Sequence, residues 1–204
     1  AQQMIAGGRA RYGLLTQSSI LSRLLPYNEP FSTYFGDGAA AMVVGPVADG
    51  YGILGSSHFS NGGDCGALVA GVPGKEWYEE GRSYWYQNEK KTVFRMLLTV
   101  ADIGKQAIDA ALEDAGSISP ATIDFFACHQ GTPWMRKVVQ EHARLTRARA
   151  LDTFPLAASL VGANIGLVMD TAVREGMLKK GDLTAVFASG VGTTWSSVVL
   201  RWSA

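Results

Sequence analysis

The stretch FFACHQGTPW, residues 125–134, places a thiol and an imidazole in adjacent positions. An apolar run leads into Cys128 and His129, and Gly131 and Pro133 then break it, so a strand is predicted to end with a histidine at its tip. Neighbouring residues on a strand point to opposite faces. If His129 faces a pocket, Cys128 therefore faces the packing, and we expect Cys128 to be a core thiol rather than the partner of His129.

The remaining histidines and cysteines give weaker signals. A lone histidine is more often structural than catalytic, so the spacing alone does not make His129 a catalytic residue. His58 follows two serines near a predicted strand end, and His142 lies among charged residues of a predicted helix. Cys65, in GGDCGAL, has no neighbour in sequence that would act as its base. No set of these residues or of carboxylates has metal-ligand spacing, so no zinc site is predicted.

Two glycine-containing stretches raise further alternatives. GVGTTW, residues 190–195, is not G-x-G-x-x-G, and a strand rather than a helix follows it, which argues against a phosphate-binding loop. It is either a plain tight hairpin or a turn whose glycines let backbone N–H groups approach a reacting carbonyl. GANIG, residues 162–166, is most simply the close packing of a helix start. Ser159, like His129 and Gly190, follows a predicted strand, where catalytic groups of α/β folds gather.

The composition limits the classes of protein to which this chain could belong. The chain has 204 residues, 47% of them hydrophobic, which is enough for one domain with its own core. Acidic and basic residues balance at 18 each, so charge gives no reason to expect a nucleic-acid or membrane partner. No apolar stretch approaches the roughly 20 residues of a membrane span. Two cysteines form no disulfide framework and fit a reducing compartment, so we expect the cytoplasm.

Predicted strands and helices alternate along the chain. Strands are expected within residues 11–20, in the apolar run after Gly38 and at 51–59, with the last two as partners, and a loop-rich segment follows at 60–92. A long amphipathic helix is predicted over 92–115. Later strands and helices end in an antiparallel pair over 183–202, so the class is α/β with a largely parallel sheet covered on both faces. Residues 4–6 read as the last turn of a helix, so the chain is expected to begin in mid-element.

The order of three segments is more specific than any single motif. YFGDGAAAMVV, then FFACHQ, then the last fifty residues resemble the β-ketoacyl-ACP synthase III family of the thiolase superfamily. The resemblance implies a layered αβαβα fold with mostly parallel sheets, built from two similar halves. Residues 1–75 would be the tail of the N-terminal half, 76–91 an aromatic-rich connecting loop, and 92–204 the C-terminal half.

The same resemblance implies roles for three residues. Members of the family use a Cys-His-Asn triad, and His129 matches its histidine. The nucleophilic cysteine would lie in the first half, outside this chain. Ser159 stands where the family has its catalytic asparagine, and Gly192 falls on the glycine whose N–H helps form the oxyanion hole. A serine hydroxyl is a shorter and weaker donor than an amide, which disfavours malonyl condensation and favours simple acyl transfer.

The resemblance therefore implies an acyltransferase or condensing enzyme of fatty-acid or polyketide-type secondary metabolism. It would take an acyl group from CoA or an acyl carrier protein through a cysteinyl thioester, with no other cofactor and no metal. Its partners would be the N-terminal half, as a separate or clipped chain, and a second copy of the assembled unit. Without that half, residues 1–204 are not expected to fold. The alternative is a non-catalytic ketosynthase-like partner subunit of a heterodimer.

Overall fold

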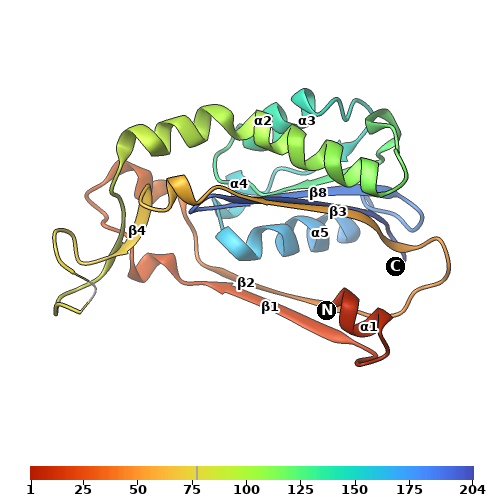
Figure 1. Cartoon of the computed structure of the whole chain (residues 1–204), viewed down its shortest axis with the longest axis horizontal. Helices are drawn as coiled ribbons and strands as arrows, with labels where there is room; N and C mark the ends of the chain where they lie inside the picture. The colour runs from red at the N-terminus through yellow and green to blue at the C-terminus, as the bar shows by residue number, and fades with distance from the viewer. Residues whose placement is uncertain (77) are drawn as a thin grey trace.

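Helices and sheets alternate in four layers (Figure 1). The structure is a computed structural model that describes residues 1–76 and 78–204. Helices α2 (Lys90–Asp114) and α3 (Met135–His142) cover one face of a central sheet, and α5 (Asn164–Arg174) lies on the other. A two-stranded sheet of β1 (Gly13–Ser19) and β2 (Gly38–Val44) packs beyond α5.

The central sheet has the strand order β3-β9-β8-β6-β7. Its bounds are β3 (Gly52–Ser60), β6 (Phe125–Cys128), β7 (Arg149–Ala150), β8 (Leu183–Gly190) and β9 (Thr194–Arg201). Four of its strands run in one direction and β9 runs against them, so the sheet is mixed and mostly parallel. The predicted α/β class, the thiolase-like layering and the antiparallel pair at the end of the chain are confirmed.

The partner of β3 differs from the prediction. We expected β3 to pair with β2, but β3 pairs with β9, and β2 pairs with β1. Helix α2 packs on both β3 and β9, and its approach to β3 needs glycine, because a Cβ on Gly55 would lie 2.4 Å from the carbonyl oxygen of Ala111. A boundary at residue 75 therefore does not separate two sheets, since β3 already belongs to the sheet of the C-terminal half.

The predicted connecting loop over 76–91 is also corrected. It contains β5 (Tyr84–Gln87), which forms a hairpin with β4 (Leu68–Gly71), and it includes the start of α2 at Lys90. The sequence YWYQ of β5 is rich in aromatic residues, which favour the pleated, half-buried surface of a strand. Trp77, one of the aromatic residues assigned to this loop, lies outside the described residues.

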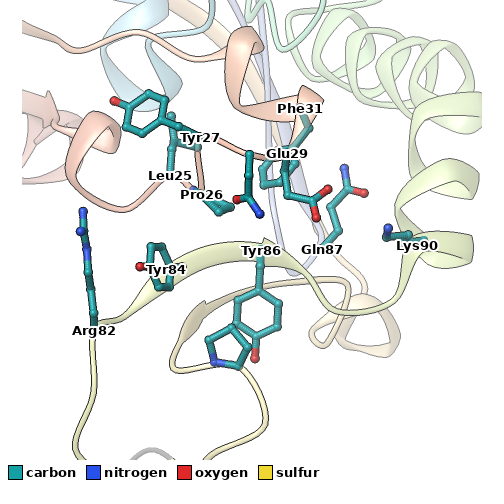
Figure 2. A pocket seen from close by; sticks show the side chains of 12 residues that line it. Leu25, Pro26, Tyr27, Glu29, Phe31, Arg82, Tyr84, Tyr86, Gln87 and Lys90 are labelled. Atoms are coloured by element: carbon teal, nitrogen blue, oxygen red, sulfur yellow. The ribbon is translucent and has the colours of Figure 1, made fainter.

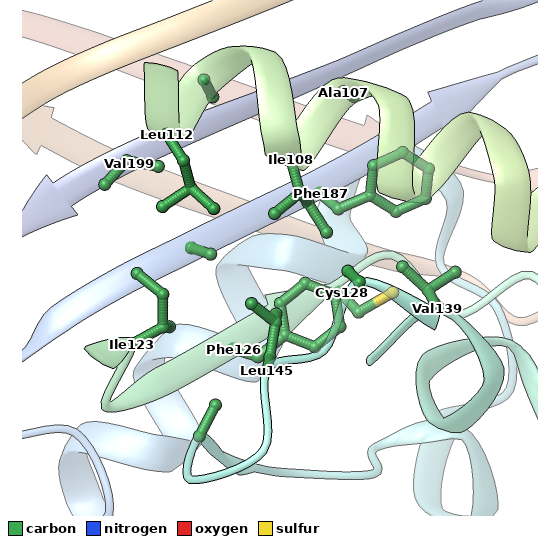
Figure 3. Close-up of a cluster of buried hydrophobic side chains, with 14 of the residues drawn as sticks. Ala107, Ile108, Leu112, Ile123, Phe126, Cys128, Val139, Leu145, Phe187 and Val199 are labelled. Atoms are coloured by element: carbon green, nitrogen blue, oxygen red, sulfur yellow. The ribbon is translucent and has the colours of Figure 1, made fainter. Parts of the chain in front are cut away.

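Two apolar clusters fill the faces of the central sheet. Figure 3 shows the upper cluster, in which Cys128 lies beneath α2 beside Ile108 and Phe187, and all three residues are 0% exposed. Cys128 is thus a core thiol, as its place on the strand predicted. Phe125 and Ala127, the alternate residues of β6, join the lower cluster with α5. His129 is the next alternate residue after Ala127, so it lies on the side of the sheet that α5 covers.

The two-stranded sheet is tightly packed on one face only. Gly166 of α5 approaches β2 so closely that an added Cβ would lie 2.4 Å from Cβ of Ala40. Leu14 and Val43, on β1 and β2, remain largely exposed.

No helix among the described residues is long and apolar enough to cross a membrane. The short elements are α1 (Gln2–Ala6), α4 (Phe154–Ala157), η1 (Leu21–Arg23), η2 (Pro30–Tyr34), η3 (Gly62–Asp64), η4 (Pro120–Thr122) and η5 (Val161–Ala163).

Candidate active site

One edge of the central sheet collects the polar groups that could do chemistry. The parallel strands β3, β6, β7 and β8 all end at this edge. The residues that follow these strands are Asn61, His129, Leu151 and Val191. Active sites of α/β folds form at the carboxyl ends of parallel strands, because the loops after them converge there.

His129 is fixed to this edge by its backbone. Its N–H donates to the carbonyl oxygen of Phe187 at 2.8 Å, which extends the ladder between β6 and β8. Burial lowers the pKa of the imidazole to about 4, and a hydrogen bond to the backbone of Val161 opposes part of that shift. The imidazole is therefore neutral at physiological pH and can accept a proton.

Ser159 is held by a segment far away in sequence. It is 1% exposed; its N–H donates to the carbonyl oxygen of Tyr34 at 2.9 Å, and its own carbonyl oxygen accepts from Gly36 at 3.0 Å. A Cβ on Gly36 would lie 2.3 Å from the carbonyl oxygen of Ala157, so the turn before β2 needs glycine in order to reach this segment.

The backbone on both sides of Ser159 is strained. Ala158 has φ 54° and Val161 has φ 51°, in a region that residues with a side chain, above all β-branched ones, rarely adopt. Such outliers cluster at functional sites, where the surrounding structure enforces them. The hydroxyl oxygen of Ser159 accepts a long bond of 3.5 Å from the Val161 N–H, which leaves the hydroxyl proton available as a donor.

Gln130 and Asn164 join these segments, and the sequence analysis missed both roles. The Gln130 side-chain oxygen accepts from the N–H groups of Thr153 and Phe154, each at 2.9 Å, and its amide nitrogen donates to Leu151. The Gln130 N–H donates to Oδ1 of Asn164 at 2.5 Å. The dipeptide HQ directly after a strand was the available signal, because a buried glutamine must find partners for its whole amide.

The structure brings two of the three predicted site residues into one neighbourhood. His129 contacts the backbone of Val161, two residues after Ser159. Gly192 lies at the same sheet edge, in the turn between β8 and β9, with φ 116° and no other heavy atom within 4 Å of an added Cβ. The catalytic roles of His129, Ser159 and Gly192 remain predictions.

The cysteines and the other histidines occupy different settings. Cys128 donates its S–H to the carbonyl oxygen of His129 at 3.1 Å, and burial raises the pKa of its thiol. It is therefore unsuited to act as a nucleophile. Cys65 is exposed just after η3. His58 lies opposite Ser196 within the sheet, and the imidazole of His142 contacts Asp102 at the surface.

Comparison with known proteins decides the family. The family described as 3-oxoacyl-[acyl-carrier-protein (ACP)] synthase III matches residues 1–62, and its C-terminal part matches residues 112–202. The chain belongs to this synthase III family. The β-ketoacyl-[acyl-carrier-protein] synthase III of Caldanaerobacter subterraneus is 31% identical over 100% of this chain and 62% of its own length. The enzyme of the same name from Sphingopyxis alaskensis is 32% identical over 98% and 61%.

Solved structures of synthase III and ketosynthase proteins have the same fold as this chain. The synthase III of Thermus thermophilus superposes with a TM-score of 0.83 at 26% identity, over 100% of this chain and 63% of that one. The priming β-ketosynthase of the R1128 polyketide pathway superposes with a TM-score of 0.83 at 22% identity, over 98% and 60%. This synthase III family member thus spans about three-fifths of the length of the relatives that it matches.

A cavity of about 560 Å³ lies between the segment 25–31 and β5 (Figure 2). Its walls are residues 25–31 on one side and residues around β5 on the other, with Tyr27, Tyr84 and Tyr86 among them and the cations Arg82 and Lys90 at its margin. An aromatic contact of Trp85, which does not line the cavity, connects β5 to the Ser159 segment. The ring of Trp85 packs against that of Phe35 at 4.7 Å, and Phe35 forms a β-bridge with Ser159.

Proposed function

We propose that this protein transfers an acyl group from a CoA or acyl-carrier-protein thioester to an acceptor, through a cysteinyl thioester. The observation that carries the proposal is the half-buried, neutral imidazole of His129 beside the strained Ser159 segment, at the strand-end edge of a synthase III fold. Relatives that bear the name β-ketoacyl-[acyl-carrier-protein] synthase III support this class of reaction.

Each group has a defined part in the proposed transfer. The acceptor's hydroxyl, amine or activated carbon attacks the thioester carbon and gives its proton to His129. The negative charge that develops on the thioester oxygen is stabilised by the Ser159 hydroxyl and the Gly192 N–H. Collapse of the intermediate expels the cysteine thiolate, which recovers the proton from His129. A neutral imidazole is required at the first step, and burial of His129 keeps it neutral.

The proposed thioester forms on a cysteine outside residues 1–204. The thiol of Cys128 is buried in the core, where desolvation disfavours the thiolate. The N–H of Cys65 donates to the carbonyl oxygen of Gly62, but its thiol makes no hydrogen bond or ion pair with any described residue, so no base is in place to activate it. A first thiolase-like half, on the same or another polypeptide, would supply the nucleophile. The exposed apolar side chains of Leu14 and Val43 suit a sheet that further strands would extend and cover.

The proposed substrate class rests on Ser159 and on the cavity beside β5. A serine donor is weaker than the amide of an asparagine, so transfer to a nucleophilic acceptor is favoured over decarboxylative condensation. The cavity beside β5 combines tyrosine rings with Arg82 and Lys90. Such walls suit the phosphate-bearing carrier of an acyl group, either CoA or the phosphopantetheine of a carrier protein. Acyl carriers of fatty-acid or polyketide-type metabolism meet this description.

Two features favour a second candidate. Neither cysteine among residues 1–204 is a suitable nucleophile, and by the family resemblance Ser159 stands where a stronger amide donor is expected. A non-catalytic ketosynthase-like subunit of a heterodimer would tolerate both features, since it would only complete the fold or the pocket of its partner.

Acyl labelling of the purified native protein, with any flanking or associated chain retained, separates these candidates. The protein is mixed with isotopically labelled acyl-CoA or acyl-carrier protein, and intact mass and peptide mapping locate the added group. We expect a thioester on a cysteine outside residues 1–204 and its loss when an acceptor is added. Labelling of Cys65 would overturn the mechanism, and a protein that never acquires the label would be the non-catalytic subunit.

A further inference from the structure

A buried carboxylate lies beneath the glycine turn between β8 and β9. Asp64 is only 6% exposed, yet it is not isolated. Its carboxylate accepts from Nδ2 of Asn61 at 3.0 Å and from the hydroxyl of Thr193 at 3.2 Å, and it forms an ion pair with the guanidinium of Arg95. These four residues, the Asp64 cluster, join the end of β3, the beginning of α2 and the turn.

The backbone of the turn is bound to the same place. The N–H of Asn61 donates to the carbonyl oxygen of Thr193 at 2.7 Å, and the N–H of Thr193 donates back to Asn61 at 2.8 Å. The Asn61 side-chain oxygen accepts from Gly63, which fixes the first residues of η3. Thr193 is therefore held through its N–H, its carbonyl oxygen and its hydroxyl, while Arg95 neutralises the carboxylate that binds the hydroxyl.

The hydrogen bonds to Thr193 fix the position of the turn, and local packing at Gly192 does not. The loop 191–193 contains only three residues, and Gly192 has φ 116° with open space around the position of an added Cβ. Side-chain packing at Gly192 thus contributes nothing to the position of its N–H. The neighbouring Thr193, anchored by Asp64 and Asn61, is the fixed point from which that position is set.

We propose that Asp64 is a positioning residue, which holds the Gly192 N–H where it can donate to the developing oxyanion. The inference rests on the proposed acyl transfer and adds to it a residue that touches no reacting atom. Loss of the carboxylate would leave the buried hydroxyl of Thr193 without its acceptor and would release the exposed Asn61 amide and Arg95 guanidinium, so the turn would lose its anchor and shift. An oxyanion donor that moves loses much of its value, because its effect depends on preorganised geometry.

Two measurements on the native protein test this role. In Asp64→Ala we expect the amides of residues 190–194 to exchange about 10-fold faster, because the hydrogen bonds that hold the turn open more often. We also expect kcat for acyl transfer to fall ~10- to 100-fold while KM changes less than about 2-fold, because the turn acts on the transition state. Asp64→Asn, which keeps one acceptor oxygen, should recover part of both losses.

Asp109→Ala is the matched control. Asp109 is a carboxylate on α2 that pairs with Lys105, so its removal also breaks an ion pair of this helix but leaves the turn intact. Neither exchange in 190–194 nor kcat should change. If Asp64→Ala does not fold, Thr193→Val removes only the hydroxyl and should still raise exchange about 3-fold.

The outcomes separate this inference from the proposed function. Unchanged exchange in the turn of Asp64→Ala, or an unchanged kcat in a protein whose wild type transfers acyl groups, would overturn the role of Asp64. If the wild type transfers no acyl group, the proposed function fails. The exchange measurement still decides in that case whether Asp64 fixes the turn.

Discussion

The backbone N–H of Gln130 donates to Oδ1 of Asn164 at 2.5 Å, across 34 residues of sequence. This bond ties the strand end that carries His129 to the first residue of α5. Both residues are almost fully buried, and Gln130 also binds the backbone of residues 151–154. The geometry around His129 therefore depends on a residue that makes no contact with the proposed reaction.

Removal of that acceptor should destabilise the protein. Asn164→Ala leaves the buried Gln130 N–H unpaired, and we expect the free energy of unfolding to fall by about 2 kcal/mol. Asn88→Ala is the control, because the exposed side chain of Asn88 makes a single bond to Gly66 and should cost less than ~1 kcal/mol. Chemical denaturation measures both variants. Equal stabilities of the two variants would show that the bond between Gln130 and Asn164 contributes nothing.

His129 should give the protein a specific dependence on pH. Its folded-state pKa of about 4 lies below the unfolded value of 6.5, so the unfolded state binds the proton first as the pH falls. Stability from this residue is complete above pH 6.5 and is lost as the pH falls from 6.5 towards 4. Between pH 7 and pH 5 we expect a loss of about 2 kcal/mol that is absent from His129→Gln. Denaturation of both proteins at the two pH values measures it, and identical losses would contradict a neutral imidazole with a lowered pKa in the folded protein.

The strained backbone beside Ser159 predicts opposite effects of two small substitutions. Ala158→Gly should stabilise the protein by up to ~1 kcal/mol, because glycine adopts φ 54° without strain. Gly36→Ala should strongly destabilise it, because the new Cβ would meet the carbonyl oxygen of Ala157 at 2.3 Å. Thermal unfolding of the two variants provides the comparison. A destabilising Ala158→Gly would mean that the strain is not present in solution.

The donor at position 159 sets the expected reaction preference. Ser159→Asn should raise decarboxylation of malonyl thioesters about 10-fold, because an amide is the stronger oxyanion donor. Transfer to the natural acceptor should stay level or fall, because asparagine is bulkier in a site where Ser159 is 1% exposed. Release of labelled CO₂ from malonyl-CoA measures the first effect. Rapid decarboxylation by the wild type would mean that Ser159 is an adequate donor and that the protein is a condensing enzyme.

Local sequence patterns predicted the elements that local chemistry determines. The run FFACHQG predicted a strand that ends at His129, with Cys128 turned into the core, because strand alternation fixes which side each residue faces. The helix after residue 90 and the final hairpin followed from an apolar period and a glycine turn. Each of these features depends on residues that are close together in the chain.

Contacts between segments that are distant in the sequence could not be predicted from local sequence patterns. An apolar strand after a short loop favours pairing with its neighbour, but β3 pairs with β9, and α2 packs over both strands with its close approach at Gly55. GANIG was interpreted as simple helix packing, although Asn164 binds Gln130. Asp64 meets Thr193 across 129 residues. A buried polar side chain finds its partner only when the fold is complete, so its role cannot be assigned from its neighbours in sequence.

The most direct test of the central claim is the rate of acyl transfer from the preformed acyl-enzyme in the native protein and in His129→Ala. We expect a fall of ~10²- to 10⁴-fold in transfer, the usual contribution of a general base, with a smaller effect on acylation. Cys128→Ala, which alters the neighbouring residue on the other face of β6, should transfer at close to the native rate. Near-native transfer by His129→Ala would remove His129 from the mechanism and contradict the account.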